Sequence, residues 1–304
     1  MRRTGPVSGA VPGARLSGTL RGIVAMLAAC AAFGVVDAML KVLGGHFAPA
    51  QVVALRGWSS LPMIALYILW RREGGQVFHR GMRWHLHLMR GVLSVLMLVL
   101  YTSGLRTMGL GEAYTLSFVA PLLISLLAVP LLGERIQPRH WVAIVVGFGG
   151  VVVALRPEGD AFLTTGALAV LGAAVCYALS NVLGRLASRT EPSSALVFWT
   201  TVSLAVGGGA LALPVWTPVS AQHVPAIATL AVAGFLAQLA ISEAFRHGQA
   251  AAVAPFEYSA LAWGLLLDWL IWRATPDAWT LAGSAIIIAS GLYLVRREAP
   301  RAAG

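Results

Sequence analysis

The chain has 304 residues, of which 58% are apolar or aromatic and 11% are charged. Soluble globular domains carry about 25% charged residues, so this composition argues against a soluble enzyme or DNA-binding domain. The 22 Lys and Arg outnumber the 12 Asp and Glu, which gives a formal net charge of +10. These cations stand between long apolar runs, whereas a nucleic-acid partner requires them clustered on one face. The composition indicates a polytopic membrane protein that binds no nucleic acid.

The hydropathy pattern predicts ten membrane-spanning helices, because ten apolar runs approach the length that crosses a hydrocarbon core of about 30 Å. The alternation of apolar and polar residues expected of an outer-membrane barrel is absent. The predicted fold class is therefore an all-α polytopic membrane protein. The predicted spans are 22–43, 49–70, 84–105, 111–132, 139–155, 164–187, 195–214, 224–245, 250–272 and 277–295.

The distribution of Lys and Arg predicts that both termini are cytoplasmic. Sixteen of the 22 cations fall in the connections on one face of the predicted bundle, and positive residues concentrate on the cytoplasmic side. Four fall on the opposite face, and Arg56 and Arg90 lie within spans. The larger group is Arg2, Arg3, Arg15, Arg21, Arg71, Arg72, Arg80, Arg83, Arg135, Arg139, Arg185, Arg189, Arg246, Arg296, Arg297 and Arg301.

The two halves of the chain resemble each other and predict an internal repeat. At one offset, Asp37 aligns with Asn181 and Lys41 with Arg185, and proline-containing blocks further along align in the same order. Because each half holds five spans, the second copy must be inverted, and an inverted five-plus-five repeat is typical of transporters. The predicted division is a disordered basic cytoplasmic tail (1–20), a first five-helix repeat (21–157), a second five-helix repeat (163–297) and a cytoplasmic tail (298–304).

Two sets of sequence blocks carry a resemblance to a known family. The first set is 90–93 (RGVL), 109–113 (GLGEA), 120–122 (APL) and 132–135 (LGER); the second is 243–246 (EAFR), 254–258 (APFEY) and Pro276. With these blocks the chain resembles the drug/metabolite transporter superfamily and its EamA-type branch over residues 20–297. It departs at Trp272-Arg273, where the second repeat of the family often has Gly-Glu. The resemblance implies ten helices, the bacterial inner membrane and transport of small organic solutes.

The leading hypothesis is a secondary transporter that moves a small polar organic metabolite by alternating access. The resemblance favours export of an amino-acid-like or amino-acid-derived compound, including an opine-type metallophore, with protons as a candidate coupling ion. The alternative is import of a nutrient such as riboflavin or S-adenosylmethionine. An intramembrane enzyme and a membrane scaffold are remote alternatives. The oligomeric state stays open, a homodimer included.

Ionisable residues within spans are costly in a bilayer, so each is a candidate for binding substrate or protons. Helix rise places Asp37 and Arg56 in the outer third of the bilayer, where they can pair; the alternatives are a purely structural pair and an Asp37–Lys41 contact. Arg90 and Glu257 both fall about 10 Å from the inner ends of their spans. Glu257 is the stronger candidate, because a carboxylate partly removed from water can load and unload a proton. Its alternative role is to neutralise Arg90.

Four uncharged residues complete the candidate site. Tyr258 and Trp263 flank this region and can stack on an aromatic or cationic cargo. Asn181 and Gln238 can hydrogen-bond a polar substrate. All four residue types also serve in helix packing, which is the competing interpretation.

Charged residues near the predicted span ends are expected to be structural. The expectations are solvated pairs of Glu112 with Arg106 and of Glu243 with Arg246, an interfacial Asp268, and a basic surface cluster at His85 and His87.

The sequence predicts no cofactor, no metal site and no catalytic activity. Cys30 and Cys176 both lie in apolar runs, and no Cys/His group has metal-ligand spacing. The motifs of a phosphate-binding loop, a zinc-protease helix and a serine nucleophile elbow are all absent from the sequence.

Overall fold

The computed structural model describes residues 12–78, 81–132, 138–155, 164–247 and 253–298. All regular elements in these ranges are helical, which confirms the predicted all-α class. Seven helices are long and apolar enough to cross a membrane, so the chain is a multi-pass membrane protein. These seven are Leu20–Gly44, Pro49–Trp70, Trp84–Leu105, Leu110–Leu132, Thr165–Ala187, Ser193–Val215 and Ala221–His247; the shorter apolar helices are Ile144–Ala154 and Ala278–Tyr293.

The elements follow one another with short connections. They are α1 (Pro12–Gly44), α2 (Pro49–Trp70), α3 (Gly74–Val77), α4 (Trp84–Leu105), α5 (Leu110–Ser117), α6 (Ala120–Leu132), α7 (Pro138–Ala154), α8 (Thr165–Ala187), α9 (Ser193–Ala212), η1 (Leu213–Val215), η2 (Ala221–His223), α10 (Val224–His247), η3 (Ala254–Tyr258), α12 (Ser259–Leu267), η4 (Asp268–Trp272) and α13 (Ala278–Glu298).

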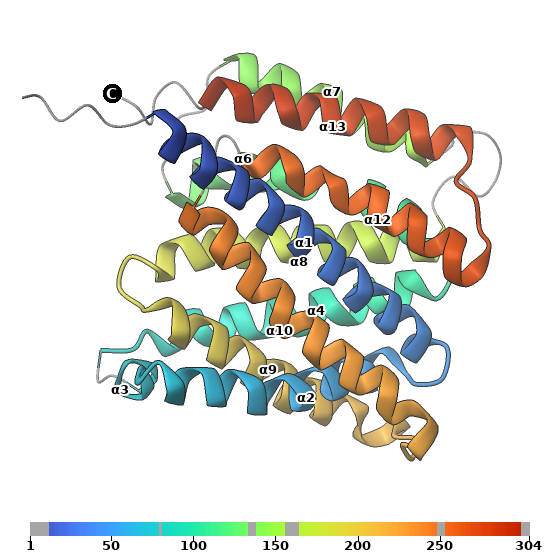
Figure 1. The fold of residues 1–304 in the computed structure, drawn as a ribbon. Coiled ribbons are helices and arrows are strands. Elements are labelled where there is room, and N and C mark those ends of the chain that lie inside the picture. The colour runs from blue at the N-terminus through green and yellow to red at the C-terminus, as the bar shows by residue number, and fades with distance from the viewer. Residues whose placement is uncertain (1–11, 79–80, 133–137, 156–163, 248–252, 299–304) are drawn as a thin grey trace, which may run out of the picture.

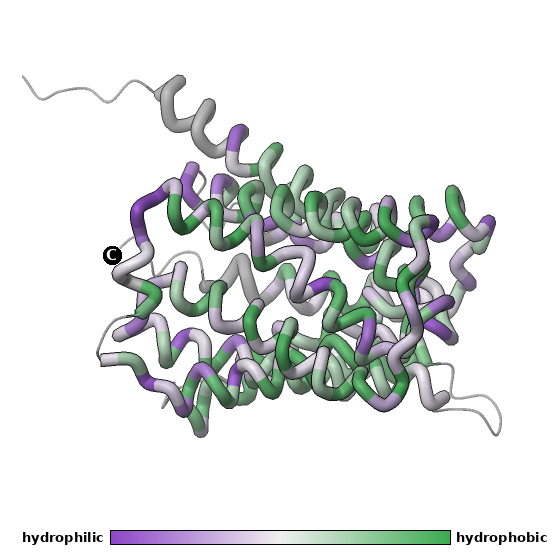
Figure 2. The backbone as a smooth tube through the Cα atoms, turned by 90° about the horizontal axis from the view of Figure 1, so that it is seen from below, coloured by the Kyte–Doolittle hydropathy of each residue, from purple (hydrophilic) through white to green (hydrophobic). Residues whose placement is uncertain are grey.

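The long helices form two layers (Figure 1). In this view α13, α12, α1 and α10 lie in front of α7, α6, α8 and α4, and α2 and α9 close one side. The most extensive packing joins α1 to α10, α4 to α8, α2 to α9 and α13 to α7. The start of α1 and the end of α13 lie at the same end of the bundle, here called the near end. The opposite end is called the far end. Hydrophilic segments gather toward these ends (Figure 2).

Two of the predicted spans are interrupted. The fourth is divided into α5 and α6, and Pro121, which supplies no backbone N–H, stands just after the break. The ninth is divided into η3, α12 and a π-helical turn, η4, and Pro255 lies in η3. A π-helical turn within a helix frequently marks a functional site. The predicted span 111–132 corresponds to the membrane-length segment Leu110–Leu132 with a break inside it, and the described part of the predicted span 250–272 holds three helical pieces from Ala254 to Trp272.

The N-terminal boundary also differs from the prediction. Helix α1 begins at Pro12, so residues 12–20, which were expected to lie in a disordered tail, are helical. The remainder of that predicted tail and the predicted C-terminal tail from residue 299 lie outside the described residues.

Small residues let α2 and α9 pack closely. A Cβ atom added at Gly57 would collide with the backbone of Ala205, and one added at Gly208 would lie 2.7 Å from the Ala54 nitrogen. Such close backbone approach is a principal source of helix association in a bilayer, where there is no hydrophobic driving force between helices. The two glycines are therefore required for the contact between α2 and α9.

Substitution of Gly57 by valine is expected to separate these two helices. Overpacking costs about 1–3 kcal/mol, and more where backbone must move, so we expect an at least five-fold lower yield of monodisperse protein in detergent. Gly149→Ala is the matched control, because nothing lies within 4 Å of an added Cβ there. Equal yields of the two variants would contradict the close packing of α2 on α9.

Candidate functional site

The site begins with Asp37, which lies in the long helix α1. The hydroxyl of Tyr114 on α5 donates a hydrogen bond to its Oδ2 at 2.6 Å. The Tyr101 hydroxyl on α4 and the Arg56 guanidinium on α2 also interact with the Asp37 carboxylate. Four helices that are separated in the sequence therefore converge on one carboxylate. Arg56 therefore acts on Asp37 through its charge, without a direct ion pair among the described contacts.

Asp37, Arg56 and the two tyrosines combine opposite charges with hydroxyl groups. Asp37 and Arg56 carry opposite charges, and the two tyrosine side chains beside them are buried, with 8–9% of their surface exposed. Charges inside a bilayer-spanning bundle are retained where they pair with one another or contact a transported solute. A carboxylate beside a guanidinium offers both an acceptor for an ammonium group and a donor fork for a carboxylate.

Lys41, one turn beyond Asp37 on α1, does not pair with it. Its Nζ lies 3.2 Å from Oδ1 of Asp268 in η4, and it stands over the Trp272 ring at 4.3 Å from the centroid. The other oxygen of Asp268, Oδ2, accepts a hydrogen bond from the Gly111 backbone N–H at 2.9 Å. Asp268 is only 4% exposed, so it lies within the protein and not in a solvated position.

Glu257 lies nearer the other end of α1, in the short helix η3. The Cys30 Sγ on α1 lies 3.6 Å from the Glu257 backbone oxygen, which places η3 against α1. The Glu257 side chain is exposed, and its charge acts on Tyr258 and on Tyr177 of α8. Tyr177 is 46% exposed even though α8 packs against α4, α5 and α6. Both Glu257 and Tyr177 are therefore accessible side chains.

Arg90 is not placed with Glu257. It lies against α8, where its Nε donates to the Ser180 backbone oxygen at 3.3 Å and its guanidinium covers Gly184. Its Nη1 is buried without a hydrogen-bond partner among the described residues. The prediction that Glu257 and Arg90 form one set is therefore not supported by the contacts, and Arg90 is a partly buried cation with an unused Nη1 donor among the described residues.

The aromatic candidates have packing partners. The Tyr258 ring meets Phe118 edge-on at a centroid distance of 5.1 Å, and its hydroxyl lies against Gly291 of α13. Phe118 in turn stacks with Tyr114 at 6.4 Å, so an aromatic row leads from Tyr258 to the partner of Asp37. Trp263 packs with Cys30 and against Gly34 on α1. Trp263 therefore joins α12 to α1.

The amide candidates point in different directions. Asn181 donates from Nδ2 to the Tyr177 backbone oxygen at 2.9 Å, within α8 and close to the residue that Glu257 influences. Gln238 is exposed on α10. Asn181 therefore lies beside Tyr177 on α8, whereas Gln238 lies on the exposed surface of α10.

Tyr101 and Tyr114 were not identified from the sequence. A tyrosine within an apolar run resembles any other packing aromatic. The one available signal is that Tyr114 follows the 109–113 block directly, so that it lies one turn into the helix which that block begins.

Two expectations for the span ends are wrong. Glu112 accepts a hydrogen bond from the Gly109 N–H at 3.3 Å and so caps α5 instead of pairing with Arg106. His87 is 4% exposed and lies 3.5 Å from the Glu191 carboxylate, so it is no part of a surface cluster, whereas His85 is exposed.

The pairing of Glu243 with Arg246 is confirmed. Their N–O distance is 3.1 Å, and both side chains are exposed. This solvated pair differs from the charges around Asp37, and it provides a control for them.

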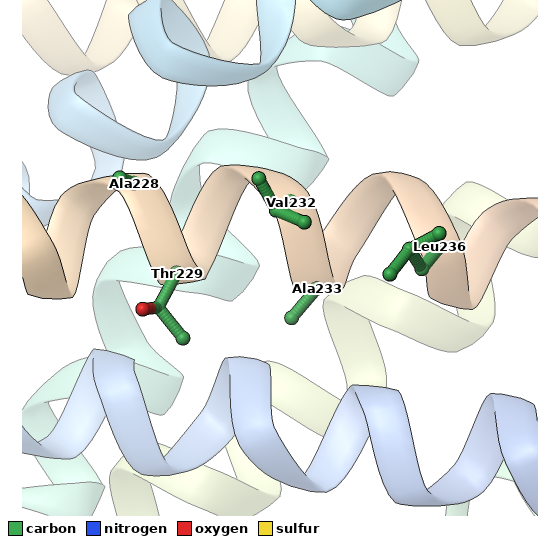
Figure 3. Close-up of a pocket in the computed structure, with 5 residues that line it drawn as sticks. All are labelled: Ala228, Thr229, Val232, Ala233 and Leu236. Atoms are coloured by element: carbon green, nitrogen blue, oxygen red, sulfur yellow. The ribbon is translucent and has the colours of Figure 1, made fainter.

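An apolar groove of about 340 Å³ lies on α10 (Figure 3). It is lined by Ala228, Thr229, Val232, Ala233 and Leu236, and Thr229 and Ala233 point toward α1. The Thr229 hydroxyl is its single side-chain polar group, so this groove does not have the chemistry of a polar-solute site. Within the described residues, no three His, Cys, Asp or Glu side chains gather where a metal ion could be held.

The sequence profile of the EamA-like transporter family matches this chain twice, over residues 20–156 and 164–296. The chain belongs to the EamA-like transporter family. The predicted resemblance is thereby confirmed, and it makes the chain a transporter and not an enzyme.

Curated relatives of this family member cover most of its length. The pseudopaline exporter CntI of Pseudomonas aeruginosa is 25% identical over 91% of this chain and 96% of its own. The S-adenosylmethionine uptake transporter of Rickettsia felis is 28% identical over 86% and 88%. The riboflavin transporter of Rhizobium johnstonii is 31% identical over 71% of both chains. A crystal structure with 22% identity shares the fold, with a TM-score of 0.62 over 92% of this chain and 99% of that one.

Proposed function

We propose that this EamA-family protein is a secondary transporter of a small polar organic metabolite with an amino-acid-like group. The observation that carries the proposal is the convergence of α1, α2, α4 and α5 on Asp37, which offers an acid, a base and two hydroxyls in a bundle of apolar helices. An ammonium group pairs with Asp37 and a carboxylate with Arg56. Asn181 and the unused donor of Arg90 are further candidates for contact with the cargo.

The proposed topology is ten spans in an inverted five-plus-five repeat, with both termini in the cytoplasm. Each half matches the family profile separately, and the interrupted spans, the fourth and the ninth, hold corresponding positions in the two halves. Interrupted helices at corresponding positions indicate the binding site in inverted-repeat transporters. The described ends of the chain lie at one end of the bundle, as an even number of spans requires.

The proposed direction is export, with inward proton flow as the driving force and Glu257 as the proton carrier. Its support is the exposed position of Glu257 toward the near end, which this topology assigns to the cytoplasm. Import of a nutrient is the second candidate, since the relatives include both an exporter and an uptake transporter.

Untargeted metabolite profiling of cells and spent medium tests function and direction together. We expect deletion of the gene to raise one amino-acid-like compound inside the cells and lower it in the medium, and the wild-type gene to reverse both changes. Glu243→Gln, which alters the solvated pair on α10, is expected to complement as the wild type does. Loss of uptake in the deletion strain would instead establish import, and no change in any metabolite would contradict transport.

A further inference from the structure

The far end of the bundle holds a second group of charges, which the proposed binding site does not use. Both oxygens of the buried Asp268 are engaged, one by Lys41 at 3.2 Å and the other by the Gly111 N–H at 2.9 Å. The Lys41 ammonium is also held over Trp272. This group, Lys41–Asp268–Gly111, is called the latch. It joins α1 and α5 of the first half to η4 of the second half.

The backbone at the latch is shaped for this contact. A Cβ atom added at Gly109 would lie 2.8 Å from the Asp268 Oδ2, and one added at Gly111 would collide with Leu265 of α12. The start of α5 therefore rests directly on α12 and η4. The π-helical turn of η4 ends at Arg273, whose φ of 54° is left-handed. Non-glycine residues rarely adopt this conformation without a local reason.

One helical turn of α5 and one helical turn of α1 connect the latch to the proposed binding site. Gly111 lies one turn before Tyr114 on α5, and Lys41 lies one turn after Asp37 on α1. The Asp37–Tyr114 hydrogen bond and the latch are thus consecutive cross-links between α1 and α5. A movement of α5 away from η4 that breaks the latch also displaces Tyr114 from Asp37.

We propose that Asp268 is a positioning residue, which closes the far end of the transport path and holds Tyr114 against Asp37. This inference rests on the proposed function for its meaning, because a closed far end is one of the two states that alternating access requires. Glu257 and Tyr177 are exposed on the near side of Asp37, whereas Asp268, Tyr101 and Tyr114 are buried. The residues around the latch are therefore the buried ones, as a closed far end requires.

A buried ion pair contributes little net stability, because desolvation offsets most of the attraction between its charges. A small net stability suits an ion pair that must break in each transport cycle. The Lys41–Asp268 pair also crosses between the two halves of the chain, 227 residues apart, which is the interface that moves when one repeat rocks against the other.

The accessibility of an introduced cysteine to a thiol reagent tests the latch and requires no cargo. The reporter is Leu265→Cys, one turn from Asp268 toward the interior, in a chain whose own cysteines are replaced (Cys30→Ser, Cys176→Ala). A membrane-impermeant thiol reagent is added from the far side of oriented vesicles. We expect Asp268→Asn and Lys41→Met each to raise the rate of modification at least about five-fold, because each shifts the population toward the open far end.

Three controls separate a latch from a structural role. Lys41→Arg keeps the charge and is expected to stay near the parent rate, and so is Glu243→Gln at the solvated pair. Reagent on the near side should modify the reporter no faster in the latch variants than in the parent. Lys41→Met leaves the Asp268–Gly111 bond in place, so it carries the test if Asp268→Asn does not fold.

Rates within about two-fold of the parent in the folded latch variants would overturn the proposal. Equal acceleration from both sides would also overturn it, because general loosening has no sidedness. Since this measurement involves no transport, its failure is distinct from a failure to find a cargo.

Discussion

Replacement of Asp37 by asparagine is expected to lower transport of the cargo at least about 30-fold. The amide can still accept the hydrogen bond from Tyr114, but the charge that faces Arg56 is lost. Loss of a carboxylate that binds the ammonium group of the cargo costs about 2 kcal/mol or more, and 1.4 kcal/mol corresponds to ten-fold in affinity. The measurement is the initial rate of cargo flux into liposomes at equal amounts of folded protein.

The matched control for Asp37→Asn is Glu243→Gln, which removes a carboxylate from an exposed pair with Arg246. Exposed pairs contribute little because solvent screens their charges, so this variant should transport at close to the wild-type rate. If both variants lost flux equally, or if Asp37→Asn kept full flux, Asp37 would not be part of the binding site.

Replacement of Glu257 by glutamine is expected to abolish flux driven by a pH gradient. Glu257 is exposed on η3, and an amide at this position cannot carry a proton. Exchange of labelled for unlabelled cargo without a gradient should continue within about three-fold of the wild type, because binding at Asp37 does not require Glu257. The measurement compares gradient-driven uptake with counterflow in the same liposomes. Unchanged gradient-driven uptake would remove Glu257 as the proton carrier.

The charges within apolar runs were the part of the site that the sequence could predict. A carboxylate or guanidinium in a bilayer-spanning helix is costly, so Asp37 and Arg56 are identifiable without a fold, and helix rise gives their depths. The contacts of Arg90 and Glu257 were not predictable in the same way. Depth along a helix does not say which face the residue occupies, and Arg90 faces α8.

The latch could not be predicted from the depth of a residue along its helix or from its charge. Asp268 stands near the end of an apolar run, where a solvated position is the ordinary expectation. Its burial depends on Gly109 and Gly111, which admit the start of α5 beside it, and on Lys41 at a distance of 227 residues in the sequence. Such a contact exists only in the folded chain. The same reason applies to His87 and Glu191, which meet where α4 begins and α8 ends.

More of the fold than of the binding site could be predicted from the sequence. Hydropathy located the membrane-length segments to within a few residues, since length and apolar content alone decide whether a segment can cross a bilayer. The breaks in the fourth and ninth spans were signalled by Pro121 and Pro255, but a proline in a membrane helix is compatible with a kink as well as with a break. The packing of neighbouring helices decides whether such a proline kinks the helix or breaks it.

Flux in liposomes that contain only the purified protein tests the central claim most directly. A panel of amino-acid-like metabolites is loaded, and release is followed for the wild type, Asp37→Asn and Glu243→Gln. We predict that the wild type and Glu243→Gln release at least one member of the panel and that Asp37→Asn releases the same compound at least about 30-fold more slowly. Release of no compound by the wild type, or equal release by all three proteins, would contradict transport through a site at Asp37.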